Sequence, residues 1–366
     1  MTSRAVPRSA LAVCLFAAAS CSFGKNPDLP KERELLLSSL AEHVLLPRYQ
    51  ATIDGLDALL ATSEQFCAAP SEILIRTART EWLAARNPWK ESEVFAFGPY
   101  KNEPLRLGPK IDSWPARPDS IEALIDSEVD ITPELLAESG VFLRGFPVIE
   151  YILFANDLDL EFAGTSRCDY LVAATKDLRS SVTQLQDAWL ADGGNYIGQF
   201  ATPDETGGEF DDSVEALSEV VDRLGFTAEN AHAEKLTPAL GLESVSGPDT
   251  TLLESRFSAT AIADIKSNLY GIEAVFYGDL SQSPDAIGLN HYLYFLGHEF
   301  DLQLRELLDN AHAALDAVGQ PNAAIEASSL RVSTAIESLK ELQRFLQSEV
   351  TKGLNFSVGF NDTDGD

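Results

Sequence analysis

The sequence predicts an all-α protein made of two helical bundles. Apolar residues recur at spacings of three and four, as in Leu74, Ala78, Trp82, Ala85 and Trp89, which places them on one face of a helix. Alternating apolar and polar runs of the kind that form strands are scarce. Because 45% of the residues are apolar and 9% are aromatic, the chain can bury a sizeable core in spite of its strong acidity.

The N-terminus has the pattern of an export signal followed by a tether. Two arginines precede an uncharged stretch, residues 9–24, which is too short for a membrane-spanning helix. Small residues then precede Cys21, as in a bacterial lipoprotein signal. We expect residues 1–20 to be a signal peptide of the lipoprotein type, Cys21 to be lipidated and residues 21–34 to be a tether. Ordinary cleavage that leaves Cys21 as a plain thiol is the alternative. The pattern predicts an exported protein, held at the periplasmic face of the outer membrane of the bacterial envelope.

The body of the chain shows helical spacing from the first third to its end. Pro70-Ser71-Glu72 is typical of a helix start. Apolar residues at helical spacing also mark residues 178–189, 214–224 and 332–350, and breaks rich in Gly or Pro mark residues 99–118, 193–194, 202–208 and 238–248. We therefore predict an N-terminal bundle over residues 35–192. A C-terminal bundle over residues 193–366 would end in an acidic tail.

A faint internal repeat adds to this division. Leu143-Arg144-Gly145 is followed by Ile149 and Tyr151, and Leu269-Tyr270-Gly271 is followed by Val275 and Tyr277 at the same offsets. Two related halves would explain these matches, and chance similarity between two helix starts would explain them equally well.

The cysteine count predicts one disulfide. The chain has four cysteines, of which Cys14 leaves with the signal peptide and Cys21 is the expected lipid site. Cys67 and Cys168 then remain as an even pair in an oxidising compartment. We expect a Cys67–Cys168 bridge; two separate buried thiols are the alternative.

The segment over residues 144–154 is the most informative for function. Pro147 suits the first position of a helix, and Glu150 would then fall in the first turn, where a carboxylate gains from the helix dipole. Its neighbours are apolar, so Glu150 is expected in a sheltered place, where a carboxylate must be paired, bound to metal or protonated. The alternative is a carboxylate satisfied by backbone N–H groups.

This segment resembles the signature of a known family. Gly-Phe-Pro-Val-Ile-Glu-Tyr-Ile-Leu-Phe, residues 145–154, is similar to the Gly-x-His-x-x-Glu-Tyr-Leu-Leu-Phe signature of imelysin-like proteins. Further similar segments lie in the same order at residues 45–49, 82–99, 111–115, 168–189, 235–236, 254–258 and 359–366. The resemblance implies two related bundles of the four-helix type packed side by side, with the signature at the groove between them. It also implies bacterial envelope lipoproteins tied to iron acquisition, some of them named insulin-cleaving peptidases.

One departure from the signature weakens catalysis and metal binding. Pro147 stands where the family has His, and Pro cannot ligate a metal. A catalytic zinc site has typically three protein ligands. His298-Glu299 does not complete a His-Glu-x-x-His motif, because the fifth residue is Leu302. The closing residues 362–366 resemble the start of a calcium loop without its Glu, and are expected to be only an acidic tail.

The charge excludes some partners, and the motifs give a candidate site. The net charge is −30, or −32 without the two arginines of residues 1–20, which argues against nucleic acid and against docking on anionic lipid through a basic face. The membrane is therefore expected to be contacted only through the N-terminal lipid. The predicted ligand-binding groove consists of Arg86, Gly145, Glu150, Glu254, Ser255 and Ser258.

These observations predict a non-catalytic lipoprotein that binds a ligand or partner near Glu150 in a process linked to iron acquisition. The expected partners are iron or another small ligand and envelope proteins of an iron-uptake system, with Glu150 as the candidate metal ligand. A metallopeptidase of the imelysin type that uses Glu150 and remote ligands is one alternative. A structural or assembly lipoprotein is the other.

Overall fold

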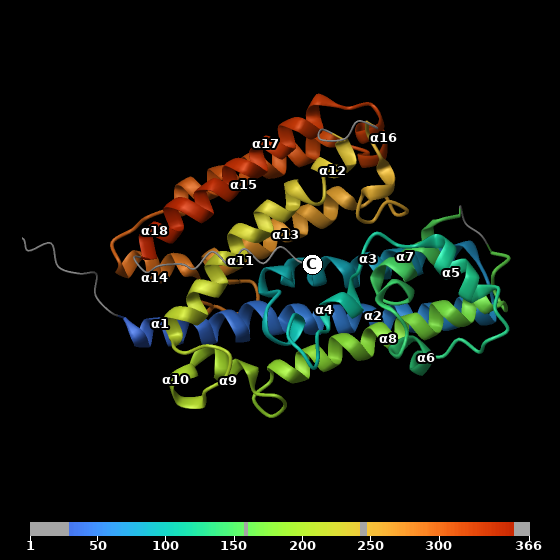
Figure 1. The fold of residues 1–366 in the computed structure, drawn as a ribbon, viewed down its shortest axis with the longest axis horizontal. Helices are drawn as coiled ribbons and strands as arrows, with labels where there is room; N and C mark the ends of the chain where they lie inside the picture. Colours follow the sequence, from blue (N-terminus) through green and yellow to red (C-terminus); the bar gives the residue numbers. More distant parts are fainter. Residues whose placement is uncertain (1–28, 157–159, 242–246, 355–366) are drawn as a thin grey trace, which may run out of the picture.

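The computed structural model describes residues 29–156, 160–241 and 247–354, and over these ranges the chain forms helices and no strand (Figure 1). The predicted all-α fold is confirmed. The predicted signal peptide, the lipid site at Cys21 and the acidic tail over residues 355–366 lie outside the described residues.

The first bundle is built around a long N-terminal helix. α1 (Pro30–Ser39) continues through a π-helical segment (Leu40–Leu45) into α2 (Leu46–Ala68). α2 packs against α3 (Glu72–Ser92) and α8 (Ser166–Trp189), and α7 (Phe146–Phe154) contacts α3 and α8. α3 starts where predicted, because the Ser71 hydroxyl accepts a hydrogen bond from the Leu74 N–H at 3.3 Å.

Four further long helices form the second bundle. They are α11 (Ser213–Ala233), α13 (Ala261–Tyr277), α15 (Asp301–Val318) and α17 (Leu330–Phe345). α15 packs on α17 and α13, and α11 packs on α17 and α13, which closes the bundle. A second π-helical segment (Leu346–Val350) and α18 (Thr351–Leu354) extend α17. The apolar positions predicted over residues 332–350 are buried in this core.

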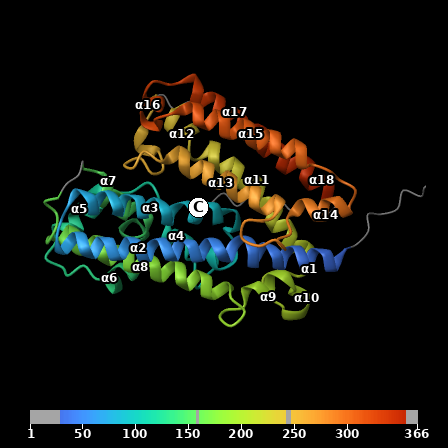
Figure 2. The same cartoon turned by 180° about the vertical axis from the view of Figure 1, so that it is seen from behind.

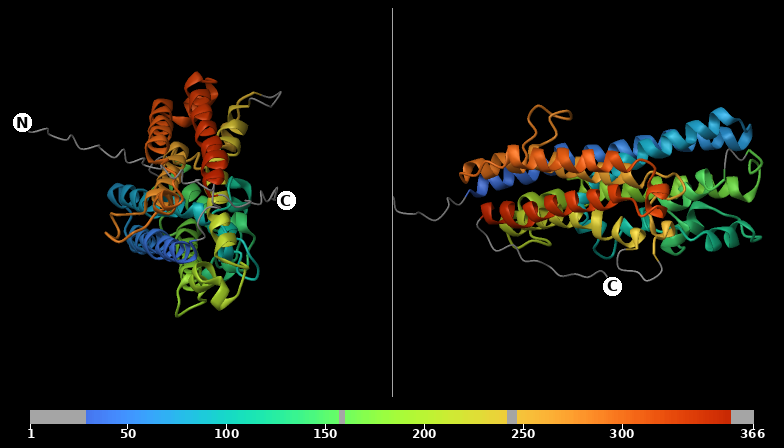
Figure 3. Two further views of the ribbon diagram at one scale, coloured as in Figure 1. Left: turned by 90° about the vertical axis from the view of Figure 1, so that its left-hand side faces the viewer. Right: turned by 90° about the horizontal axis from the view of Figure 1, so that it is seen from above.

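Short helices fill the predicted breaks and the connections. In the first half these are α4 (Gly108–Ile111), α5 (Pro118–Ile125) and α6 (Pro133–Ala137). Between the bundles and within the second they are α9 (Tyr196–Ala201), α10 (Pro203–Thr206), α12 (Thr237–Leu240), α14 (Leu289–Phe295) and α16 (Pro321–Glu326). The long helices of both bundles run roughly along the long axis of the molecule (Figures 2 and 3).

The two bundles meet along α3 and α13, the pair with most contacts between them. Gly271 of α13 makes this approach possible, because a Cβ there would lie 2.2 Å from the Glu91 carbonyl oxygen. α1 also contacts α9, α11 and α14, so the N-terminal helix packs on both halves of the chain. The boundary at residue 193 stays a prediction.

The disulfide is confirmed, and the two segments of the internal repeat do not occupy equivalent places in the helices. Cys67 at the end of α2 is bonded to Cys168 at the start of α8, with their Cα atoms 5.8 Å apart. The two copies of the repeat have different local structure. Residues 143–145 precede α7, whereas residues 269–271 lie inside α13.

Candidate functional site

The site lies where α7 and α3 of the first bundle face the loop that leads into α13. Gly145 caps α7 with φ = +81°, and a Cβ there would lie 2.3 Å from the Ile111 carbonyl oxygen. α7 begins at Phe146, so Pro147 is its second residue and Glu150 lies just beyond the first turn, one position later than predicted. The sequence put the start at Pro147 because Pro suits either of the first two positions.

Glu150 is buried, with 3% of its surface exposed, and its carboxylate reaches across to the second bundle. One oxygen accepts hydrogen bonds from the Phe257 N–H at 3.0 Å, from the Ser258 N–H at 2.8 Å and from the Ser258 hydroxyl at 2.8 Å. Burial raises the pKa of Glu150 to about 7, against the lowering effect of the Ser258 N–H and of Arg86. The backbone N–H groups foreseen for Glu150 thus come from the other bundle and not from its own helix.

Arg86 pairs with carboxylates other than Glu150. Its guanidinium bonds Asp264 and Glu254, each at 3.0 Å, and lies 3.3 Å from Asp112. It also lies over the Trp82 ring, 5.2 Å from the ring centroid. The described contacts of Arg86 therefore pair it with these three acids.

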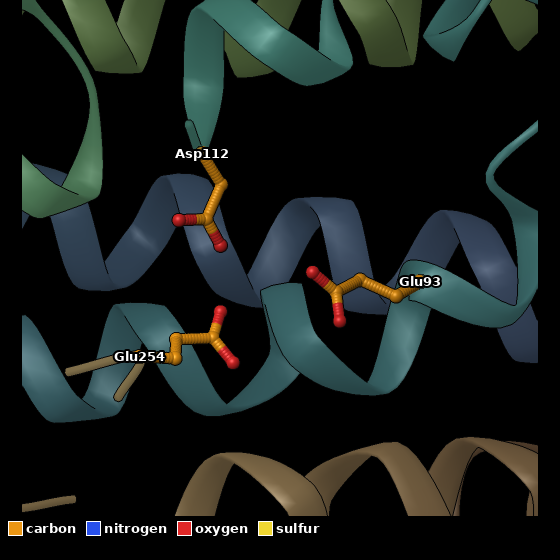
Figure 4. Close-up of side chains that lie close together, drawn as sticks. All are labelled: Glu93, Asp112 and Glu254. Atoms are coloured by element: carbon orange, nitrogen blue, oxygen red, sulfur yellow. The ribbon is translucent and has the colours of Figure 1, made fainter. Parts of the chain in front are cut away.

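Lys90, one helical turn after Arg86, occupies the centre of three carboxylates. Figure 4 shows Glu93, Asp112 and Glu254 turned toward one another, with one oxygen of each within 4.8 Å of the others. The Lys90 ammonium lies 2.6 Å from Glu93 and 2.7 Å from Asp112 and also contacts Glu254. A geometry that could hold a metal ion therefore already holds a cation of the chain itself.

A third cation completes what we name the interface charge network. Lys235 lies 2.9 Å from Glu254 and 3.3 Å from Glu93, and it donates to the Asn268 side-chain oxygen at 2.7 Å. The network comprises the cations Arg86, Lys90 and Lys235 and the carboxylates Glu93, Asp112, Glu254 and Asp264. All of its members except Glu93 are almost fully buried.

The network favours the charged forms of Glu254 and Lys90. Burial opposes ionisation of Glu254, but Lys235, Lys90 and Arg86 outweigh it and hold the pKa of the Glu254 carboxyl far below its usual range. Burial likewise opposes the charge on Lys90, and Asp112, Glu254 and Glu93 more than offset it, so that the pKa of Lys90 is raised. Each charge in this interior is therefore held by opposite charges at contact distance.

Two cavities flank the loop over residues 112–116. The cavity beside Glu150 has about 10 Å³ of free volume, room for one water molecule, and Pro147, Arg86 and Ser255 line it with Glu150. The second has about 110 Å³ and is lined by Tyr100, Trp114, Arg223, Phe226, Asn230 and Lys235, among others. Among the described residues, no histidine lines either cavity.

Hydrogen bonds and ion pairs join five residues of the predicted groove at this site, in part through Asp264: Arg86, Glu150, Glu254, Ser255 and Ser258. The sixth, Gly145, caps the helix that carries Glu150. Ser255 donates to Asp264 at 2.5 Å, and Ser258 to Glu150. Ser255 has φ = +48°, so the loop before α13 is locally strained. The sequence did not predict that Lys90, Asp264 and Asn268 belong to the site. It also did not predict the roles of Asp112 and Lys235 in the interface charge network. The signal for Lys90 was its position four residues after Arg86 and next to Trp89, at the edge of the predicted apolar face of α3.

The comparisons with known proteins identify the family and the fold. The family model described as Imelysin, peptidase M75, matches residues 45–346. "Iron-regulated protein A" of Synechococcus elongatus is 24% identical over 320 residues, which cover 86% of this chain and 85% of that protein. Among the described helices, none is both long and apolar enough to cross a membrane.

Two crystal structures share the fold. One is that of a putative iron-regulated protein A precursor from Parabacteroides distasonis, with a TM-score of 0.73, 21% identity and coverage of 91% of this chain and 97% of that one. The other is that of an imelysin-like protein from Psychrobacter arcticum, with a TM-score of 0.73, 20% identity and coverage of 91% and 99%. With a family model that covers most of its length and a fold that agrees, the chain belongs to the imelysin family.

Proposed function

We propose that this protein is a non-catalytic, lipid-anchored protein of the bacterial envelope that binds a small ligand or a protein partner between its two bundles. The link to iron rests on the relatives, two of which are named iron-regulated protein A. The anchor rests on the export pattern before Cys21. The binding site would be the predicted groove around Glu150 together with the adjoining interface charge network.

The observation that carries the non-catalytic proposal is the position of Lys90. A catalytic metal needs carboxylate or imidazole ligands and an open position. Here the three converging carboxylates are neutralised by Lys90, Arg86 and Lys235. Glu150 is the fourth candidate ligand, and it accepts N–H and O–H donors at 3.0 Å or less. These donor sets do not fit a resident metal ion.

Access decides where a ligand would bind. The cavity beside Glu150 holds about one water molecule, so a larger ligand there would require the loop over residues 254–260 to move. The neighbouring cavity of about 110 Å³ has room for a ligand without such a movement. Its wall includes Asp112 and Lys235 of the interface charge network and Asn268, which accepts a hydrogen bond from Lys235. A small polar ligand there would contact the same charges from the other side.

A structural or assembly lipoprotein is the second candidate. The small volume beside Glu150 and the mutual pairing of the groove residues favour it, since a packed interface needs no ligand. It predicts that no small molecule changes the stability of the protein.

Titration of the purified exported chain with iron tests the proposal that the site holds no metal ion. We expect no binding at micromolar iron, with Glu150→Ala and the exposed control Glu138→Ala alike. Tight iron binding that Glu150→Ala abolishes and Glu138→Ala keeps would overturn the metal-free reading. Chelator-sensitive cleavage of an unfolded protein substrate, with zinc, iron or calcium supplied, would overturn the non-catalytic one. Mass spectrometry of the N-terminal peptide, compared with Cys21→Ser, tests the anchor.

A further inference from the structure

Four exposed apolar side chains lie on segments that meet at the end of the molecule where α1 begins. Eleven large apolar side chains are well exposed among the described residues. Four of them lie on α1 and over residues 294–302, and we name these four the end patch: Leu35 at 60% exposed, Tyr294 at 64%, Phe295 at 48% and Leu302 at 87%. Figures 1 and 3 show the start of α1 and α14 at the same end of the long axis. Scattered exposed apolar residues are ordinary, and a concentration at one end is not.

The end patch is held firmly to the N-terminal helix. Arg33 of α1 donates to the Tyr292 hydroxyl of α14 at 3.1 Å and to the Ser213 hydroxyl at 3.1 Å. The Ser39 hydroxyl accepts the Ile287 N–H at 2.7 Å. Tyr294 and Phe295 lie edge to face, 6.4 Å apart. α1 and the aromatic pair therefore move as one body.

The length of chain before α1 limits the distance of this end from a lipid anchor. Pro30, the first residue of α1, is nine positions after Cys21. A chain spans at most ~3.3–3.6 Å per residue, so Pro30 stays within about 30 Å of the lipidated residue. This step rests on the lipidation at Cys21 that belongs to the proposed function. Given that anchor, the end of the molecule nearest the bilayer is the end that carries the patch.

We propose that the end patch inserts into the headgroup region of the membrane. The long axis of the protein would then point away from the bilayer surface. Tyr and Phe favour the membrane interface, where an aromatic ring can be partly buried while polar groups stay wet. The exposed Glu299 beside the patch and the acidic body would be repelled by anionic lipid. The partner is therefore a zwitterionic surface, and the contact is apolar and not basic. It goes beyond the expectation that only the N-terminal lipid touches the membrane.

The test uses the exported chain with Cys21→Ser, so that the patch acts without the lipid. Its partition onto vesicles of phosphatidylethanolamine and phosphatidylcholine is measured by flotation. Replacing Tyr294, Phe295 and Leu302 together by Ser is expected to lower the partition coefficient about tenfold or more, because each side chain loses apolar area that the interface buries. Adding phosphatidylglycerol is expected to weaken binding of the parent chain.

Exposed apolar side chains outside the end patch provide a matched control. Ile73, Val129 and Leu330 are 77%, 53% and 80% exposed, and their replacement by Ser should leave partition unchanged. Equal partition of the patch variant and the parent chain would overturn the proposal, and so would equal losses in both variants. A concentration-dependent dimer that only the patch variant abolishes, without flotation of the parent, would assign the patch to a second copy and also overturn it. If Cys21 carries no lipid in the native protein, the proposed lipid anchor is refuted. The end patch is tested independently of that result, because its flotation is measured in the Cys21→Ser chain.

Discussion

Replacing Lys90 by Met removes a buried charge while keeping most of the side-chain volume. Lys90 is fully buried and lies 2.6 Å from Glu93 and 2.7 Å from Asp112. Removing one partner of a buried ion pair costs about 3–5 kcal/mol, because the opposite charges are left uncompensated. For a chain larger than 250 residues, about 2 °C per kcal/mol gives a melting temperature ~6–10 °C lower. Lys340, whose pair with Glu337 is exposed, is the control, and Lys340→Met should change the melting temperature very little.

The same substitution should create a cation site that the natural protein lacks. Without Lys90, the four carboxylates of the interface charge network outnumber its two remaining cations by two. A divalent ion could then take the place of the ammonium among carboxylate oxygens. At a hundred times its dissociation constant, a bound ion adds about 2.7 kcal/mol to the stability. In thermal unfolding, calcium or manganese should therefore restore more than half of the stability that Lys90→Met loses.

Two results would refute this reasoning. A melting temperature of Lys90→Met equal to that of the natural protein would mean that Lys90 does not compensate buried carboxylates. Stabilisation of the natural protein by the same ions, to the same extent as the variant, would mean that Lys90 does not block a cation site.

Three further predictions test the packing around the site. The pKa of Glu150 in the folded protein, about 7, lies above the unfolded value near 4.5, so the contribution of this group to stability is largest below pH 4.5 and is lost as the pH rises to 7. The loss is worth about 3 kcal/mol. Thermal unfolding at several pH values should show it in the natural protein and not in Glu150→Gln. Reduction of Cys67–Cys168, a bridge that closes a loop of 101 residues, should lower the free energy of unfolding by up to ~4–5 kcal/mol, measured in denaturant with and without reductant. Gly271→Ala should destabilise by roughly 1–3 kcal/mol, because its Cβ would meet the Glu91 carbonyl oxygen, whereas Gly140→Ala meets open space and should be tolerated in the same unfolding assay.

The sequence predicted the fold because helical periodicity is a local property. The apolar face over residues 332–350 and the cap at Ser71 depend on neighbours in the chain, and both were found as predicted. The Cys67–Cys168 bridge followed from counting and from the expected compartment. The sheltered position of Glu150 followed from its apolar neighbours.

The partners of the site residues could not be predicted in the same way. Arg86 and Asp264 are 178 positions apart, and no periodicity relates α3 to α13. The acid with which Arg86 pairs depends on how closely α3 and α13 approach each other. That distance depends on Gly271, and the sequence alone does not show this role of the glycine. Lys90 was missed for a related reason, since a lysine is usually at the surface and only the converging acids make its burial stable.

The charge network also explains why the family signature cannot be carried over residue by residue. Pro147 occupies the His position and lines the same small cavity as Glu150, so the pair that would face a common ligand is reduced to one carboxylate. That carboxylate is satisfied by donors from the second bundle, and the acids nearby are neutralised by Lys90, Arg86 and Lys235. A metal ion would have to displace a cation of the chain at the cost of burying an unpaired ammonium or guanidinium. For this chain the acids of the inter-bundle site are therefore already paired with cations of the chain itself.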